Sequence, residues 1–177
     1  MTHHITHILF DEHALANTVE RLGTQISRDY QGQELLVICI LKGASVFMAD
    51  LIRKIDLPIQ IDFMAVSSYG HSTQSSGVVK INKDLDTDIE NRHILIVEDI
   101  IDSGLTLKYL SENLQSRRPK SLKICTLLDK PERRKTHLNI DYTGFEIPDV
   151  FIVGYGIDYA EHYRNLPYIG VISPNAL

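Results

Sequence analysis

The 177-residue chain lacks any apolar run that approaches the roughly 20 residues a membrane-spanning helix needs, so no membrane span is expected. It also lacks a basic excess, because 18 Lys and Arg stand against 23 Asp and Glu, giving a formal charge of -5 and a pI of about 5.9. Nucleic-acid-binding modules usually carry a basic face, so no nucleic-acid partner is expected. An acidic total still allows a local basic pocket for phosphate.

Cysteine is scarce as well, with two in the whole chain. Cys39 and Cys125 each lie in a short apolar run, so both are expected to be buried free thiols in strands. No disulfide is expected, and the composition is that of a cytoplasmic protein.

Short apolar runs alternate with amphipathic stretches along the chain, and no internal repeat interrupts them. This pattern predicts an α/β fold, with a mainly parallel central sheet flanked by helices. Because the linkers are short, residues 1–177 are expected to form one domain, with a small hood made by the chain termini. Strands are predicted at residues 34–41, 59–66, 78–81, 93–97, 122–128, 150–153 and 168–172, and helices at 12–26, 44–54 and 104–117.

Two polar segments break this regular pattern. Residues 67–77 hold five serines and two glycines, so they are expected to form an exposed, mobile loop. The charged run 132–135 is expected to be solvated surface, with a subunit contact as the alternative.

The most informative segment is 94–106, where a predicted buried strand meets a predicted helix. The strand is expected to end at the adjacent acids Glu98 and Asp99, and a third acid, Asp102, precedes the helix. Ligands of open α/β sheets bind at the carboxyl ends of strands, and a helix N-terminus presents unpaired N–H groups. Residues 103–106 are therefore predicted to cradle a phosphate. The alternative is an ordinary helix N-terminus whose acidic residues stabilise the helix and bind no ligand.

Three acids beside a phosphate favour an added cation, and Mg²⁺ prefers carboxylate, water and phosphate oxygens. Carboxylates also accept hydrogen bonds from vicinal ribose hydroxyls, so the segment fits a sugar phosphate. It lacks the glycine and lysine pattern of a P-loop and the G-x-G-x-x-G of a dinucleotide fold.

The run 98–104, Glu-Asp-Ile-Ile-Asp-Ser-Gly, resembles the phosphoribosyl diphosphate signature of the hypoxanthine-guanine phosphoribosyltransferases. The signature marks phosphoribosyltransferases in general, and further segments of similar sequence point to the 6-oxopurine branch. These segments, which extend the resemblance over nearly the whole chain, are 41–43, 68–69, 127–130 and 148–166. Ser103 departs from the threonine that the family often has, but keeps its hydroxyl.

The resemblance implies a role for each residue of the acidic segment. Glu98 and Asp99 would bind the ribose hydroxyls and Mg²⁺. Asp102 would be the general base that takes the purine's proton as N9 attacks the anomeric carbon. The 5-phosphate would be bound by the loop residues Asp102, Ser103, Gly104, Leu105 and Thr106.

The resemblance also assigns the diphosphate side and the lid. Lys42, Gly43 and Arg164 would bind the leaving diphosphate. A peptide bond in that loop is often cis in the family, which here means Leu41–Lys42 or Lys42–Gly43. Ser68 and Tyr69 would belong to a lid that closes over the diphosphate.

On the purine side, Lys130 would donate to O6 of the base, which disfavours adenine because its 6-amino group is itself a donor. Phe151 would stack on the purine, and Ile152 would offer backbone groups to its edge. Asp158 would lie near a second Mg²⁺ and the purine's 2-position.

The expected protein is therefore a magnesium-dependent enzyme with the type I phosphoribosyltransferase fold. It would convert hypoxanthine or guanine and 5-phosphoribosyl diphosphate to IMP or GMP and diphosphate, as a homodimer or homotetramer. Two alternatives stay open: a preference for xanthine or another base, and a non-catalytic nucleotide-sensing regulator. The preference among hypoxanthine, guanine and xanthine depends on pocket shape.

Overall fold

The computed structural model describes residues 5–68 and 79–173. Nine strands, three α-helices and one 3₁₀ turn follow one another within these ranges: β1 (Ile5–Phe10), α1 (Glu12–Asp29), β2 (Leu35–Leu41), α2 (Ser45–Ile52), β3 (Ile59–Ser68), β4 (Val79–Lys83), β5 (His93–Ile101), α3 (Leu105–Ser116), β6 (Ser121–Asp129), η1 (Pro131–Arg133), β7 (Tyr142–Glu146), β8 (Ile152–Val153) and β9 (Ile169–Ile172).

The central sheet has the strand order β4-β3-β2-β5-β6-β7. Its strands pair in parallel except at one edge, where β4 runs antiparallel to β3. The middle strand β2 is buried almost throughout, and β5 is buried over its apolar run from Ile94 to Val97, which explains the continuous apolar sequence of each. The predicted α/β fold with a mainly parallel sheet is confirmed.

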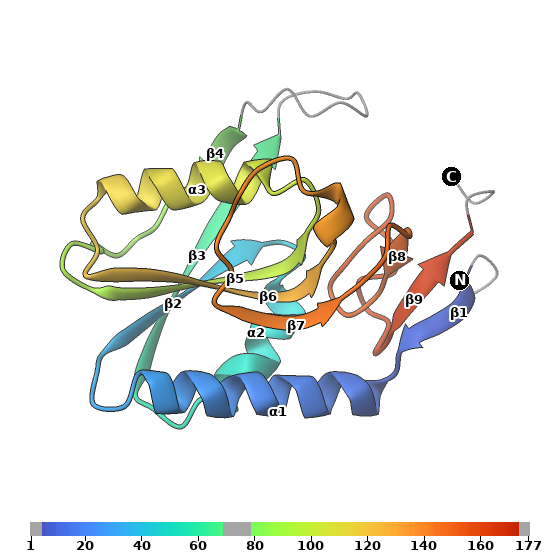
Figure 1. The fold of residues 1–177 in the computed structure, drawn as a ribbon, viewed down its shortest axis with the longest axis horizontal. Helices are drawn as coiled ribbons and strands as arrows, with labels where there is room; N and C mark the ends of the chain where they lie inside the picture. Colours follow the sequence, from blue (N-terminus) through green and yellow to red (C-terminus); the bar gives the residue numbers. More distant parts are fainter. Residues whose placement is uncertain (1–4, 69–78, 174–177) are drawn as a thin grey trace.

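Helices cover both faces of this sheet (Figure 1). One core lies under α1 and α2 and includes Leu22, Phe47 and Leu95, while the other lies under α3 and includes Leu110 and Ile96. The side chain of Asp11 accepts a hydrogen bond from the Ala14 amide (2.8 Å) and so caps the N-terminus of α1.

A smaller antiparallel sheet, β1-β9-β8, joins the two ends of the chain beside the central sheet (Figure 1). This sheet confirms the predicted hood. Both cysteines are buried free thiols, as predicted. Within the described residues, the structure contains no helix with the length and apolar character that crossing a membrane requires.

Several predicted boundaries were wrong. The strand predicted at 93–97 continues to Ile101, because Ile100 and Ile101 still pair with β6. Ser67 and Ser68, which were predicted to lie in a loop, belong to β3 and pair with β4. The rest of that predicted loop, 69–77, lies outside the described residues. The strand predicted at 150–153 is shorter, Ile152–Val153, and belongs to the hood.

Candidate active site

The predicted phosphate loop lies at the turn between β5 and α3. Glu98 and Asp99 are the last-but-three and last-but-two residues of β5 and do not follow the strand, which corrects the expected boundary. Gly104 is the N-cap of α3 with a φ of 76°, a left-handed conformation that glycine adopts without strain. The Leu105 amide approaches the Ser103 hydroxyl at 3.4 Å. Ser103 and the N-cap Gly104 thus lead into the first helical residues, Leu105 and Thr106, where backbone N–H groups can face an anion.

Glu98 and Asp99, near the end of β5, do not readily ionise together. Burial, followed by the neighbouring charge of Asp99, raises the pKa of Glu98 well above its ordinary value. Burial also raises the pKa of Asp99 to about 6. A divalent cation or the hydroxyl groups of a ribose would favour ionisation of both acids, because each stabilises charged carboxylates. The donor set therefore fits Mg²⁺.

The loop after β2 is packed tightly against these acids. Its Leu41–Lys42 peptide bond is cis. A Cβ at Gly43 would lie 1.7 Å from Oδ2 of Asp99, and one at Gly156 would lie 2.2 Å from the Gly43 carbonyl oxygen. Three segments that are distant in sequence meet here because two of them have no side chain at the contact.

The proposed diphosphate cations are paired with carboxylates of the chain itself. Nη2 of Arg164 lies 2.8 Å from Oδ1 of Asp158 and 3.4 Å from Oε2 of Glu161, and Nη1 donates to the Gly156 carbonyl (2.9 Å). The same Glu161 oxygen lies 3.0 Å from Nζ of Lys42. Lys42 therefore holds the pKa of Glu161 below its usual range. Two predicted anion-binding cations thus share one internal anion.

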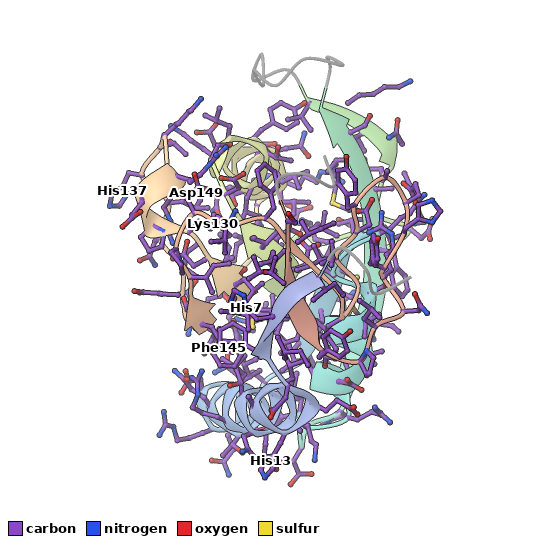
Figure 2. All side chains as sticks on the ribbon, turned by 90° about the vertical axis from the view of Figure 1, so that its right-hand side faces the viewer. His7, His13, Lys130, His137, Phe145 and Asp149 are labelled. Atoms are coloured by element: carbon purple, nitrogen blue, oxygen red, sulfur yellow. The ribbon has the colours of Figure 1, made fainter. Side chains whose placement is uncertain are left out.

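Lys130 is the most buried of the predicted cations, with 8% of its side chain exposed. Its Nζ donates to the Val150 carbonyl (2.7 Å) and to Oδ1 of Asp149 (3.4 Å), and it lies 6.0 Å from the centre of the Phe151 ring. Figure 2 shows Lys130 and Asp149 lying together. Phe151 is 57% exposed, which leaves a ring face available for stacking, while Ile152 is buried in β8.

Asp102 has a partner that the sequence did not suggest. Nε of Arg133 donates to its Oδ1 at 2.7 Å, and Nη1 of the same guanidinium lies 3.2 Å from Oδ2 of Asp149. The next residue, Arg134, pairs with the buried Asp129. The charged run 132–135 is therefore not simply solvated surface, because two of its arginines bind carboxylates of the sheet's carboxyl edge.

Some predicted site residues are not brought together. Tyr69 lies outside the described residues, and Ser68 is the last residue of β3, so the predicted lid stays a prediction. Within residues 5–68 and 79–173, no three His, Cys, Asp or Glu side chains are grouped to hold a metal ion. A cavity of about 630 Å³ lies between α1, α2 and the segment 164–167. Of the predicted site residues that the structure describes, Arg164 alone lines it, so it is not the proposed active site.

Three residues of the site were missed: Arg133, Asp149 and Glu161. Arg133 was read as part of a surface charge run, and the other two lie within the 148–166 resemblance without an assigned role. Only the folded structure reveals them, because each contacts a predicted site residue that is distant in sequence: Arg133 contacts Asp102, Asp149 contacts Lys130 and Glu161 contacts Lys42.

Comparisons with known proteins agree with this geometry. Residues 6–160 match the family model described as the phosphoribosyl transferase domain. The hypoxanthine-guanine phosphoribosyltransferase of Bacillus subtilis (strain 168) is 58% identical over 174 residues, which cover 98% of this chain and 97% of that protein. The crystal structure of a hypoxanthine phosphoribosyltransferase from Staphylococcus aureus has a TM-score of 0.94 at 52% identity, covering 97% of this chain and 94% of that one. The hypoxanthine phosphoribosyl transferase of Trypanosoma cruzi has a TM-score of 0.93 at 39% identity, covering 98% and 94%.

Proposed function

Since this chain belongs to the phosphoribosyltransferase family, with the type I fold of that family, we propose that it is a purine salvage enzyme of the 6-oxopurine branch. The reaction joins hypoxanthine or guanine to the ribose 5-phosphate of 5-phosphoribosyl diphosphate and releases diphosphate. The observation that carries the choice of base is the buried Lys130 ammonium at the carboxyl edge of the sheet, 6.0 Å from the ring centre of the exposed Phe151. A donor there suits a 6-carbonyl and opposes a 6-amino group.

The chemical step follows from the placement of the charges. The bond from purine N9 to the anomeric carbon forms as the bond from that carbon to the diphosphate oxygen breaks. Asp102, at the turn between β5 and α3, takes the purine's proton. The α3 N-terminus binds the 5-phosphate, while Lys42 and Arg164 stabilise the charge that moves onto diphosphate. Glu98 and Asp99 would hold one Mg²⁺ and Asp158 would lie near a second, and these ions would supply further stabilisation of that charge when bound.

The remaining expectations form part of the same proposal. The protein would act in the cytoplasm as a homodimer or homotetramer, with residues 1–177 as one domain. A non-catalytic regulator is not favoured, because the relatives compared above are named as transferases. A preference for xanthine would change the base but keep the reaction.

The direct test is to incubate the purified protein with hypoxanthine, 5-phosphoribosyl diphosphate and Mg²⁺ and to measure IMP formation. Parallel assays with guanine, xanthine and adenine rank the bases, and a chelator tests the need for the metal. We expect turnover with hypoxanthine or guanine and little with adenine. An absence of turnover with every 6-oxopurine would refute the proposed function.

A further inference from the structure

Four charges of alternating sign connect the proposed general base to the proposed purine lysine. They run in the order Asp102, Arg133, Asp149, Lys130, with closest nitrogen–oxygen distances of 2.7, 3.2 and 3.4 Å. This series of charges begins at Asp102 in the predicted phosphate loop and ends at Lys130, the proposed purine-binding lysine. Both arginine contacts are made by one guanidinium, through Nε to one acid and Nη1 to the other.

The backbone fixes this arrangement. The Lys130 amide donates to the Ile101 carbonyl (2.9 Å), and the Lys135 amide donates to the Ser103 carbonyl (2.9 Å). Between these two bonds lies the single 3₁₀ turn η1, in which the Arg133 amide donates to the Lys130 carbonyl (3.1 Å). These bonds hold segment 130–135 beside the predicted phosphate loop. The turn that contains Arg133 begins at Lys130, so the same backbone bonds position both residues.

The two acids of this network differ in the number of their cationic partners. Asp149 has two cationic partners, Lys130 and Arg133, and the guanidinium holds its pKa below the usual range. Asp102 has one cationic partner among the described residues, Arg133. Removing Lys130 from Asp149 would leave both acids competing for the same guanidinium.

We propose that Arg133 is a positioning residue that holds Asp102 while no base is bound and is drawn toward Asp149 when a 6-oxopurine takes the ammonium of Lys130. This inference rests on the proposed function and deepens it. A purine carbonyl is uncharged, so it cannot replace Lys130 as a partner for Asp149. Nη1 of Arg133 already donates to Asp149 at 3.2 Å, and the guanidinium then moves closer to that acid. Because one rigid planar group makes both contacts, this movement lengthens its hydrogen bond to Asp102.

The consequence is a second layer of base selection. Asp102 becomes free to accept the purine's proton after a carbonyl has been recognised at the 6-position. A 6-amino base cannot accept from the ammonium of Lys130, so it would leave Arg133 on Asp102. Discrimination against adenine would then affect the chemical step as well as binding.

The test is a set of variants assayed for kcat and KM with hypoxanthine. Asp149→Asn removes the acid that draws Arg133 away, so we expect kcat to fall about five- to tenfold while KM for hypoxanthine stays level or falls. Adding Arg133→Gln to that variant should restore kcat to within about twofold of the wild type. Adding Arg133→Lys instead should not, because the positive charge stays beside Asp102.

The control is Arg117→Gln, which removes another arginine–carboxylate pair, with Asp84, away from the site. It should leave both kinetic constants unchanged. A merely structural role for Arg133 predicts that the double variant is as slow as Asp149→Asn or slower, and that result would overturn the proposal. An unchanged kcat in Asp149→Asn would overturn it too.

A binding measurement separates this inference from the proposed function. The Nε–H signal of Arg133 in ¹⁵N-edited NMR spectra of the ligand-free protein should shift in Asp102→Asn, and it should also shift when IMP is added to the wild type. No shift in Asp102→Asn would overturn the resting contact, whether or not the protein turns over hypoxanthine. A shift with IMP that persists in Lys130→Met would overturn the link to base recognition.

Discussion

The proposed purine side, around Lys130, and the proposed diphosphate side, around Lys42 and Arg164, both pair their cations with carboxylates of the chain, but in different surroundings. Lys130 is 8% exposed and donates to Asp149 and to a backbone carbonyl. Lys42 is 68% exposed, and its partner Glu161 is 65% exposed. Most of the cost of desolvating Lys130 is therefore met by folding, whereas Lys42 must still lose water when an anion binds. The difference suits a pocket that selects a neutral base beside an open surface that attracts a highly charged sugar.

The backbones of the two sides differ as well. Lys130 directly follows β6, and its amide is bonded to β5. Glu161 lies in a loop where the positive φ values of Ala160, Glu161 and Tyr163 are 50°, 64° and 75°. Such conformations are uncommon for residues with side chains, so the surrounding contacts must maintain them. Bonds from Arg164 to the Gly156 carbonyl and to Asp158 supply such contacts.

The largest effect is expected at Asp102, the proposed general base. Asp102→Asn keeps the shape of the side chain but cannot accept the proton, so kcat should fall about 10²–10⁴-fold. The KM for 5-phosphoribosyl diphosphate should change little, because the backbone of the phosphate loop is kept. Steady-state kinetics with both substrates measure this split. An unchanged kcat would show that Asp102 is not the proton acceptor.

The next effect tests the buried lysine. Lys130→Met keeps the length and the apolar stem but removes the donor to the 6-carbonyl, so kcat/KM for hypoxanthine should fall about 100-fold. The value for adenine should fall much less, so the ratio between the two bases should shrink. Lys108→Met is the matched control, since this exposed lysine of α3 makes a weak pair with Glu112 at 3.9 Å. Equal losses for both bases would argue against a role for Lys130 in reading the 6-position.

The buried carboxyl group of Asp99 should make the free energy of unfolding depend on pH. Because burial raises the pKa of Asp99 from 3.8 to about 6, the folded state binds this proton more tightly than the unfolded state. The free energy of unfolding should therefore fall as the pH rises from about 4 to about 6. Asp99→Asn removes this loss and should stabilise the ligand-free protein by about 2 kcal/mol near pH 7.5, although it impairs activity.

Urea unfolding of the two proteins at several pH values measures this effect. The gain from Asp99→Asn should vanish near pH 4, where the carboxyl group is largely protonated in the folded state. A gain of equal size at every pH would mean that it arises from packing and not from the charge of Asp99.

Much of the fold could be predicted because β2, β5 and β6 are buried strands with continuous apolar runs. The sequence did not reveal β1, whose side chains are largely exposed, or β7, which contains Gly144. A Cβ at that glycine would lie 2.3 Å from the Leu127 carbonyl oxygen, so the residue that weakens the strand signal is required by close packing.

The candidate site divides in the same way. Acids that are adjacent in sequence at the end of a buried strand, such as Glu98 and Asp99, are visible as a motif. The partners Arg133 and Glu161 are not, because their roles depend on contacts across 31 positions with Asp102 and 119 positions with Lys42. Pairing at that distance is set by the sheet order and cannot be read from local pattern.

The smallest effect concerns the exposed pair on the diphosphate side. Glu161 binds Lys42 and Arg164 through one oxygen, and so occupies cations that the sugar diphosphate is proposed to use. Glu161→Gln keeps the side chain's size but removes the competing charge, so KM for 5-phosphoribosyl diphosphate should fall about two- to fivefold, with kcat nearly unchanged.

The size of this change separates the exposed pair from the buried one. Exposed ion pairs are screened by salt, so the advantage of Glu161→Gln should shrink when the ionic strength is raised to about 0.5 M, whereas the effects of Lys130→Met should persist. Glu90→Gln is the control, because it removes an exposed pair with Arg118 (2.8 Å) outside the site. If Glu161→Gln raised KM instead, Glu161 would be holding Lys42 and Arg164 in place for the diphosphate and not competing with it, and the two sides would then differ in burial alone.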